Sequence, residues 1–401
     1  MPKGAVVLAV NSGSSSLKCS LYDAPGRPLR LLARGAVERV GLPRARMWLE
    51  VRDEPRWSRP GEFSDASAAV GALLAALQEQ RLPAPTAVGH RFVSGGPLFR
   101  SHRLIDAAFR AALPRLVPFA PLHLPAQIRV LEAMTEHFPR LPQAACFDTA
   151  FHRGLPEEAA RLPLPGALAR QGIRRYGFHG LSFEYLTGRL GSDRRERVVL
   201  AHLGSGASLA ALRDGKPRDT TMGLTPLGGL VMGTRPGDLD PGVLLYLLNT
   251  AGYDAAHLER TLDRESGLLG ISGRTSDMRT LLERQGTDPA AALAVELFCR
   301  SVAKGVAAMA VSLAGLDVLV FAGGIGENAP AVRARVGELL SFLGLALDPQ
   351  ANARHAPLIS SPASRVRVRV IPTDEDLIIA RHTRRLALLT ASGERAAWPG
   401  R

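Results

Sequence analysis

Two short segments of the chain place glycine and serine directly after an apolar run. Residues 6–17 read VVLAVNSGSSSL and residues 198–209 read VVLAHLGSGASL, and six of the twelve positions are identical. In each copy the apolar run predicts a buried strand, and the turn after it offers backbone N–H groups and hydroxyls with little side chain in the way. Such turns suit phosphate oxygens, so the pair predicts one polyphosphate bound from both sides. Two ordinary hairpins of chance similarity are the alternative.

Further residues that can do chemistry stand at expected strand ends and in loops, where function usually lies. Asp148 ends an expected strand, where a carboxylate can hold Mg²⁺ beside phosphates or cap a helix. His179 lies between glycines, and Arg235 lies in a tight loop. The segment 321–328, FAGGIGEN, resembles a nucleotide loop, although its glycines lack the dinucleotide-binding spacing. Each of these residues alone is compatible with a structural role, and their joint occurrence in one chain favours function.

The pattern of apolar residues predicts the elements that position these groups. Strands are expected in a hairpin over 6–22, over 86–93 and 144–147, in the second hairpin, and over 317–321 and 365–371. Helices are expected over 66–80, 107–117, 125–137, 242–249, 255–265, 290–313, 330–343 and 374–388. The segment 154–166 is expected to be a loop at a domain junction, and 220–242 to be irregular. Strands that alternate with helices after each hairpin indicate an α/β architecture with two related halves.

Composition limits the possible classes of protein. With 401 residues, 46% hydrophobic and 22% charged, the chain is typical of a soluble globular protein with two or three domains. No apolar run reaches the roughly 18–20 residues of a membrane span, and the N-terminal run is too short for a secretory signal. We therefore expect a cytoplasmic protein without a membrane partner, and the three scattered cysteines fit a reducing compartment.

The formal net charge of +13 raises the question of nucleic-acid binding. Only four of the 50 basic residues are lysine, and the arginines are spread along the chain without interleaved aromatic residues. This skew indicates codon bias rather than a binding patch, so we do not expect a nucleic-acid partner. The excess charge would still help to steer an anionic substrate.

The candidate segments together resemble one known family. The motifs that carry the resemblance run from near the first residue to near the last, at 11–18, 90–91, 121–123, 147–152, 176–180, 202–204, 232–241, 270–273, 321–328 and 371–375. On these motifs the chain resembles the acetate/propionate kinase family, within the acetate and sugar kinase/heat-shock chaperone/actin superfamily.

The resemblance implies a fold and a reaction. The fold would be a duplicated actin-like ATPase (ribonuclease H-like) α/β fold of two domains with an active-site cleft between them. Residues 1–150 with 374–401 would form the N-terminal domain, completed by the C-terminal helix, and residues 151–373 the nucleotide-binding domain. The implied reaction is the reversible, direct in-line transfer of a phosphoryl group from ATP to acetate, which gives acetyl phosphate and ADP. Mg²⁺ would be the cofactor, with Mn²⁺ as a possible substitute, and a homodimer the assembly.

The resemblance also assigns roles by position. Catalysis is assigned to Arg91, Asp148, His179 and Arg235, and the metal to Asn11, Asp148 and Glu375. Acetate would be bound by Arg91 and Arg235, its methyl group by Val93, Leu122, Phe178 and Pro226, with His123 nearby. Phosphate and nucleotide contacts are assigned to Asn11, Ser14, Ser16, Lys18, His202, Gly204, Ser205, Gly206, Asp277, Met278, Arg279, Gly323, Gly324, Ile325, Gly326, Glu327 and Asn328.

The chain departs from the family pattern at six positions, one of which is Leu181 in place of a threonine. Ser205 replaces an asparagine of the second phosphate turn, and its hydroxyl has a shorter reach. Leu124 and Phe183 replace polar residues, so catalytic efficiency and acyl-chain preference do not follow from the resemblance. Ser94 and Gly228 replace a histidine and a glutamate. Two alternatives therefore stay open, a kinase that prefers propionate or butyrate and a non-catalytic nucleotide-binding switch.

Overall fold

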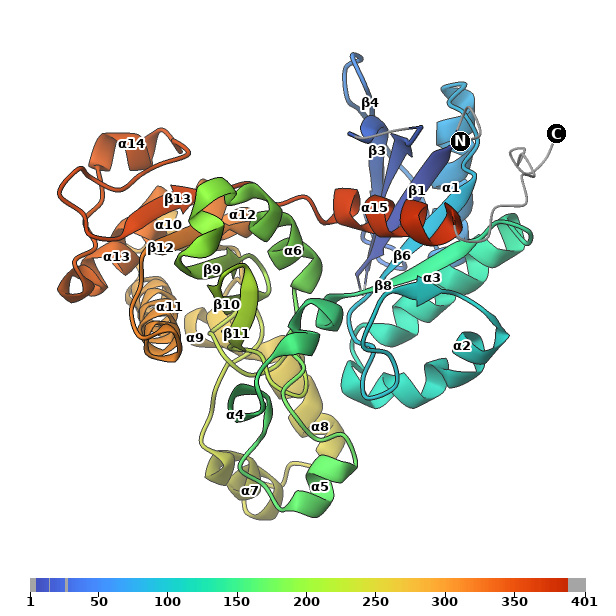
Figure 1. Cartoon of the computed structure of the whole chain (residues 1–401). Helices are drawn as coiled ribbons and strands as arrows, with labels where there is room; N and C mark the ends of the chain where they lie inside the picture. The colour runs from blue at the N-terminus through green and yellow to red at the C-terminus, as the bar shows by residue number, and fades with distance from the viewer. Residues whose placement is uncertain (1–4, 14, 26–27, 389–401) are drawn as a thin grey trace. The chain divides into compact units, whose positions relative to one another are not determined.

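The computed structural model describes residues 5–13, 15–25 and 28–388. The chain divides into two compact units (Figure 1). Unit 1 comprises Met1–Ala150 and Asp374–Arg401, and unit 2 comprises Phe151–Thr373. Within the described ranges, none of the helices has both the length and the hydropathy of a membrane span.

Unit 1 is built on a sheet of eight strands in the order β5-β4-β3-β2-β1-β6-β8-β7. The strands β1 to β5 form an antiparallel meander, whereas β1, β6 and β8 run parallel to one another. Apolar residues on one face of β1 and β2 pack beneath α1 (Ala66–Glu79) and α3 (Leu124–His137) in the core of this unit. The strand bounds are β1 Val6–Ser12, β2 Ser16–Asp23, β3 Arg30–Glu38, β4 Arg46–Val51, β5 Trp57–Pro60, β6 Ala87–Phe92, β7 Arg103–Leu104 and β8 Gln143–Phe147.

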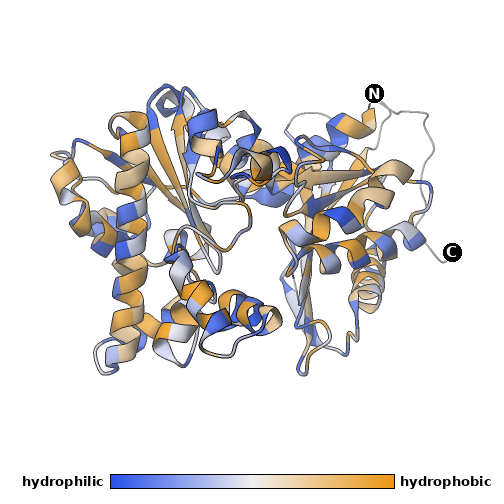
Figure 2. Ribbon diagram, turned by 90° about the horizontal axis from the view of Figure 1, so that it is seen from below, coloured by the Kyte–Doolittle hydropathy of each residue, from blue (hydrophilic) through white to orange (hydrophobic). Residues whose placement is uncertain are grey.

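Unit 2 is built on a sheet of five strands in the order β11-β10-β9-β12-β13. The hairpin β9–β10 and the strand β11 are antiparallel, and β9, β12 and β13 are parallel. The long helix α11 (Pro289–Leu313) covers one face, with apolar residues along its length (Figure 2). The strand bounds are β9 Arg197–Leu203, β10 Ala207–Arg213, β11 Lys216–Thr220, β12 Val318–Ala322 and β13 Arg367–Val370.

The two sheets share one topology. The order β3-β2-β1-β6-β8 of unit 1 has the same strand directions as β11-β10-β9-β12-β13 of unit 2. The repeated sequence segments are the central hairpins of the two sheets, with Val6 at the start of β1 and Val198 near the start of β9. The predicted duplicated α/β fold is therefore confirmed.

Each sheet packs against a helix that follows the last parallel strand of the other sheet in sequence. The helix α6 (Gly180–Arg189) follows the strands of unit 1 in sequence, yet Phe183 and Leu186 pack in the core of unit 2. The helix α15 (Glu375–Ala387) follows β13, yet it packs on β1, β6 and β8 of unit 1, as the red helix against the blue strands in Figure 1. A Cβ atom on Gly89 of β6 would lie 2.0 Å from Oγ1 of Thr383, so this close packing of α15 requires glycine.

Several predicted elements differ from those observed. The helix predicted over 107–117 is α2 (Ala107–Ala112) followed by a 3₁₀ segment (Leu113–Phe119), because Pro114 and Pro118 lack the N–H groups that an α-helix needs. The predicted loop 154–166 contains α4 (Glu157–Ala160), and the unit boundary falls before it, after Ala150. The predicted nucleotide loop is a short helix, α12 (Gly323–Asn328), that follows β12 without a connection.

Other boundaries shift at the ends of helices. The helix predicted over 255–265 is α8 (Ala255–Arg260) continued by a π-helical turn (Thr261–Glu265), and that predicted over 330–343 is α13 (Pro330–Leu339) with a 3₁₀ turn (Ser341–Leu343). The remaining helices are α5 Gly166–Arg170, α7 Pro241–Asn249, α9 Gly267–Ser272, α10 Met278–Arg284 and α14 Pro349–Ala353, with 3₁₀ segments at Asp148–Gly154 and Gly191–Arg195.

Candidate active site

The parallel strands of unit 1 bring three of the predicted residues to one edge of the sheet. Asn11 lies near the end of β1, Arg91 on β6, and Asp148 directly after β8. The carboxyl ends of neighbouring parallel strands meet at the same edge, which is where ligands bind in open α/β sheets. Glu375 joins them as the first residue of α15.

The guanidinium group of Arg91 is the centre of this cluster. Its Nη2 lies 2.7 Å from Oδ2 of Asp148, and its Nε donates to both oxygens of that carboxylate at 3.2 Å. Its Nη1 donates to Oδ1 of Asn11 at 3.1 Å, and Nδ2 of Asn11 donates to Oε2 of Glu375 at 3.2 Å. Nε of Arg91 also lies 3.6 Å from that Glu375 oxygen. The four side chains thus form one charged network.

Burial makes the ion pair in this network strong and its members dependent on each other. The side chain of Asp148 is 1% exposed, and that of Arg91 is 17% exposed. Desolvation alone would lower the pKa of Arg91, but the carboxylates of Asp148 and Glu375 raise it above its ordinary value. Arg91 is therefore a permanent cation that faces two carboxylates.

The acidic segment 374–376 contributes more than the one residue predicted from sequence. Asp374 caps α15 by accepting a hydrogen bond from the N–H of Leu377 at 2.9 Å. Asp376 accepts a hydrogen bond from Oγ of Ser20 at 2.7 Å, and desolvation raises its pKa to about 6. The adjacent acids thus have three different partners, and sequence reasoning did not single out Ser20 or Asp376.

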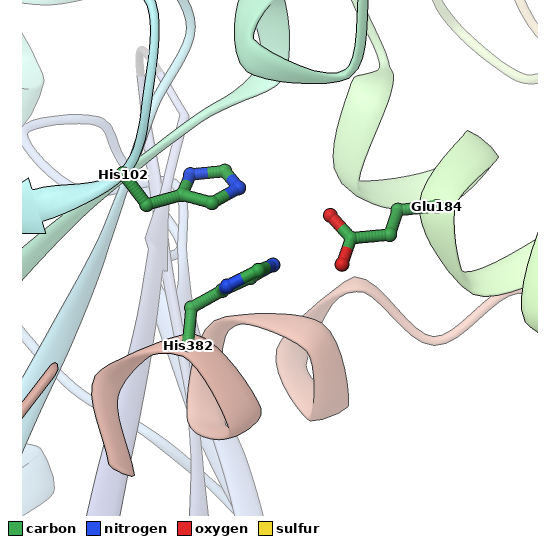
Figure 3. A group of neighbouring side chains, drawn as sticks. All are labelled: His102, Glu184 and His382. Carbon is green, nitrogen blue, oxygen red and sulfur yellow. The ribbon is translucent and has the colours of Figure 1, made fainter. Parts of the chain in front are cut away.

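A histidine pair beside this cluster was also missed. The rings of His102 and His382 lie 3.9 Å apart between centroids (Figure 3). Nδ1 of His102 accepts a hydrogen bond from the N–H of Phe147 at 3.1 Å, directly before Asp148. Glu184, labelled in the same picture, belongs to unit 2. A lone histidine before an arginine, as in the sequence of His102, carries no signal that would have identified the pair.

The first Gly/Ser turn connects β1 to β2. The N–H of Gly13 donates to the carbonyl oxygen of Ser16 at 2.8 Å, and Lys18 is exposed and directly opposite Asn11 in the register of the hairpin. Lys18 and Asn11 therefore lie on the same face of the sheet. Ser14, also predicted to contact phosphate, lies outside the described residues.

Unit 2 assembles a second cluster around its own hairpin. His179 stands before α6 with φ 55° and ψ 25°, a left-handed conformation that is uncommon outside glycine. Its ring stacks on that of His202 with centroids 4.4 Å apart and an interplanar angle of 24°. Nδ1 of His179 lies 2.8 Å from Oγ of Ser208, and Nδ1 of His202 lies 2.8 Å from Oγ of Ser182.

The glycines of the second turn lie beneath these histidines and Arg235. A Cβ atom on Gly206 would lie 2.8 Å from Nη2 of Arg235 and 3.1 Å from Nε2 of His179. Nη1 of Arg235 donates to the carbonyl oxygen of Pro226 at 2.7 Å, which fixes the guanidinium group. The structure therefore brings a cationic group and an imidazole N together over one phosphate-type turn. Ser205 of that turn is exposed.

The residues assigned to the nucleotide occupy two helix starts of unit 2. Oε1 of Glu327 accepts hydrogen bonds from the N–H groups of Gly323 at 2.9 Å and Thr373 at 3.0 Å. These two hydrogen bonds fix the start of α12. Asn328 donates from Nδ2 to the carbonyl oxygen of Gly324 at 3.0 Å. Asp277 caps α10 through the N–H of Arg279 at 2.8 Å. Asp277 and Arg279 are exposed, whereas the side chain of Met278 between them is buried.

The apolar residues assigned to acetate differ in exposure. Val93, Phe178 and Pro226 are buried, and Leu122 and His123 are partly exposed. The N–H of Val93 donates to Oε1 of the buried Gln127 at 3.1 Å, a contact that sequence reasoning missed.

Four of the departures from the family pattern, Leu181 among them, lie at buried positions. Leu124 and Phe183 are both fully buried, and Phe183 packs against Phe151 and His152. Oγ of the buried Ser94 accepts a hydrogen bond from the N–H of Gly96 at 3.1 Å. Leu124 and Phe183 are therefore core residues in this chain, and Gly228 is partly exposed.

Comparison with known proteins agrees with this arrangement. The model of the acetokinase family matches residues 6–381. The chain belongs to the acetokinase family. It is therefore a kinase, and the predicted family is confirmed. An acetate kinase of Nitrobacter hamburgensis is 46% identical over 391 residues, which cover 95% of this chain and 96% of the relative.

Solved structures of the acetokinase family confirm the fold. A propionate kinase from Francisella tularensis superimposes with a TM-score of 0.89 at 37% identity, covering 95% of this chain and 100% of that one. An acetate kinase from Porphyromonas gingivalis gives a TM-score of 0.83 at 36% identity, covering 95% of this chain and 99% of that one. The duplicated actin-like ATPase-type fold is shared with these enzymes.

Proposed function

We propose that this acetokinase catalyses the reversible transfer of the γ-phosphoryl group of ATP to acetate. The observation that carries the proposal is the convergence of Arg235 and His179 on Gly206, 2.8 and 3.1 Å from the position of a Cβ atom there. An acetate carboxylate oxygen forms a bond to the γ-phosphorus while the bond to the bridging oxygen of ADP breaks, and ADP leaves with that electron pair. Acetate is already ionised at neutral pH, so the reaction needs no strong general base.

The main barrier to this reaction is the approach of two anions. In our proposal Arg91 and Arg235 bind the acetate carboxylate and the transferring phosphoryl group, and Nε2 of His179 donates a hydrogen bond to a phosphoryl oxygen. Positive groups fixed in advance stabilise the charge on the phosphoryl group during transfer. The ion pair with the buried Asp148 holds Arg91 in place before substrate arrives.

The oxygen atoms around Arg91 fit a magnesium site. Asn11, Asp148 and Glu375 present one amide and two carboxylate groups within a single network, and Mg²⁺ prefers oxygen ligands of this kind. We propose that these three residues hold Mg²⁺, with Mn²⁺ as a possible substitute, directly or through water. When bound, the ion neutralises phosphate charge.

We further propose that unit 2 is the nucleotide-binding domain. His202, Gly204, Ser205 and Gly206 would bind phosphates, Asp277, Met278 and Arg279 the nucleoside, and Gly323, Gly324, Ile325, Gly326, Glu327 and Asn328 the ADP. In unit 1, Asn11, Ser14, Ser16 and Lys18 would bind phosphate oxygens. The hydrogen bonds at the start of α12 support its assignment to ADP binding, because Glu327 and Asn328 fix the backbone of Gly323 and Gly324.

A preference for a longer acid is a second candidate function. The Francisella tularensis structure, with a TM-score of 0.89, is described as a propionate kinase. The acyl group would contact Val93, Leu122, His123, Phe178 and Pro226. In a hydrophobic pocket one methylene changes selectivity by roughly 10–200-fold, so modest changes in these side chains decide between acetate and propionate.

Trapping of the acyl phosphate with hydroxylamine tests both functions. Acetate, propionate and butyrate are compared with ATP and Mg²⁺ for the wild type and for Arg91→Ala, Arg235→Ala and, as a matched control, the exposed Arg115→Ala. We expect acetyl hydroxamate as the main product, lost in the first two variants and retained in the third. A preference for butyrate would overturn the choice of acetate, and ATP binding without any acyl phosphate would overturn the catalytic proposal.

We propose that the enzyme is a homodimer that associates through α7. None of the residues of this helix is buried, and Val243, Leu245 and Tyr246 are 42, 60 and 61% exposed. Exposed apolar side chains gathered on one helix are costly in water, and a second copy would cover them. Light scattering after size exclusion should give a dimer for the wild type and a monomer for Leu245→Glu. Val311→Glu, at an exposed apolar position on α11, is the control and should stay dimeric.

We also propose that the enzyme works in the cytoplasm on acetate and ATP alone. The three cysteines carry free thiols and are all buried, which suits a reducing compartment.

A further inference from the structure

The ring of His179 is held by two neighbouring residues of one hairpin. It stacks on His202 of β9, and its Nδ1 lies 2.8 Å from Oγ of Ser208 of β10. His202 and Ser208 are direct partners in the register of the hairpin, so their side chains lie together on one face of the sheet. Ser208 is fully buried, and the proposed reaction gives it no role.

The ring of His202 has an equivalent contact with the start of α6, which follows His179. Ser182 lies three residues after His179 on α6, is fully buried, and places its Oγ 2.8 Å from Nδ1 of His202. That hydroxyl also lies 2.7 Å from Oγ1 of Thr373. The start of α6 and the hairpin are therefore joined by two histidine–serine hydrogen bonds.

These contacts at Nδ1 turn both Nε2 atoms toward the glycine turn. A Cβ atom on Gly206 would lie 3.1 Å from Nε2 of His179, and one on Gly204 would lie 3.8 Å from Nε2 of His202. In a neutral imidazole one nitrogen donates and the other accepts, and the partner of one nitrogen decides which.

We propose that Ser208 is a positioning residue for His179. Its hydroxyl donates to Nδ1, which leaves the ring proton on Nε2 and aims that N–H at the phosphoryl group. Ser182 does the same for His202. This inference rests on the proposed function, because it gives Nε2 of His179 its task.

Comparison of the two repeats supports a specific role. By sequence offset Val10 corresponds to His202 and Ser16 to Ser208, but the hairpin registers differ, and Cys19 lies opposite Val10 in unit 1 whereas Ser208 lies opposite His202 in unit 2. Of the two repeated hairpins, the second therefore places a serine opposite a histidine, and the first places a cysteine opposite a valine. Ser208 and Ser182 thus hold the imidazole rings of His179 and His202.

Kinetics of single variants give the first test. Ser208→Ala should lower kcat about tenfold, as the loss of a group that orients a catalytic histidine does, with KM for acetate and ATP within about twofold. Ser208→Thr, which keeps the hydroxyl, should recover most of the loss. Thr187→Val is the control, because it removes another buried hydroxyl of α6 that bonds only the backbone of Phe183 at 2.7 Å among the described contacts. It should keep the wild-type kcat.

A spectroscopic test is independent of turnover. In ¹⁵N-labelled enzyme, His179 should show a protonated Nε2 and an unprotonated Nδ1 in the wild type and in Ser208→Thr. Ser208→Ala should yield a mixture of tautomers. An unchanged tautomer in Ser208→Ala would overturn the proposal.

A double-mutant cycle separates positioning from a general structural effect. In the His179→Ala background, Ser208→Ala should cause no further loss of kcat. A further tenfold loss there would overturn the positioning role and leave the proposed function standing. If His179→Ala itself kept the wild-type kcat, the role of His179 in the proposed function would fail, and the ¹⁵N spectra would still decide whether Ser208 sets the tautomer.

Discussion

Acid should destabilise unit 2 through one buried histidine, His152. Its ring is 3% exposed, packs edge-on against Phe151 and Phe183, and has Nε2 at 3.0 Å from the carbonyl oxygen of Phe178. Nδ1 has no hydrogen-bond partner among the described residues. Burial therefore lowers the pKa of His152 to about 4, because a proton on Nδ1 would add a charge without an acceptor.

The size of the effect follows from the two pKa values. The folded protein has a value of about 4 and the unfolded chain the ordinary 6.5, so the unfolded chain binds more protons between these pH values. The stabilisation is complete above about pH 6.5 and is lost as the pH falls toward 4. Between pH 7 and pH 4.5 the loss is about 2.5 kcal/mol in the free energy of unfolding.

Denaturant unfolding at the two pH values measures this loss. His152→Gln keeps an N–H donor near the carbonyl of Phe178 without a titrating ring, so its free energy of unfolding should fall about 2.5 kcal/mol less than that of the wild type over the same interval. His257→Gln, at a partly exposed histidine of α8, should behave as the wild type does. Parallel pH dependence in the wild type and His152→Gln would refute the reasoning.

Three other substitutions have expected outcomes. Asp148→Asn leaves Arg91 without its closest counter-charge. It should lower the free energy of unfolding of unit 1 by about 3 kcal/mol in urea titrations. An unchanged value would mean that the ion pair adds no stability. Ser205→Asn lengthens an exposed side chain of the second phosphate turn and should lower KM for ATP about threefold in steady-state kinetics, whereas an unchanged KM would remove Ser205 from the phosphate site. Arg333→Met removes a fully buried guanidinium that donates to the carbonyl oxygens of Gly326 and Glu327. Calorimetry should therefore show a loss of about 3 kcal/mol in the free energy of unfolding. A neutral result would mean that these carbonyls find other donors.

The sequence predicts the central part of each unit well and the edges poorly. The hairpins were identifiable because the first strand of each carries an apolar run, VVLAV or VVLA, that repeats at a fixed offset. The strands β3 to β5 escaped detection because they approach an edge of the sheet, where arginine and glutamate interrupt the alternation; three of the four residues of β5 are exposed. Edge strands carry such charges because a bare edge would pair with other chains.

The sequence predicts the individual site residues but not how they bond to one another. The sequence places Asn11, Arg91, Asp148 and Glu375 at four strand or helix ends, and the fold brings them into one network. Their bonding could not be read from spacing, because the partners are separated by 57 to 364 residues. A supporting group such as Gln127 has no motif of its own, since a buried glutamine has the same local sequence pattern as a surface one.

The two copies of the hairpin lie among different side chains. In both copies a buried strand leads into a Gly/Ser turn, although the turns differ in length, with Ser12 opposite Leu17 in the first and Leu203 opposite Ala207 in the second. The charged partners differ: the first turn lies next to the network of Asn11, Arg91 and Asp148, whereas the second lies beneath His179 and Arg235. Because a phosphate-binding turn needs only N–H groups and space, the side chains around it can differ, and in the proposed function those of unit 1 bind metal and carboxylate and those of unit 2 stabilise the phosphoryl group. On this reasoning, substitutions at Val10 or Ser16 should leave the stacked rings of His179 and His202 in unit 2 unchanged. Substitutions at Ser208 should leave the Arg91–Asp148 ion pair unchanged.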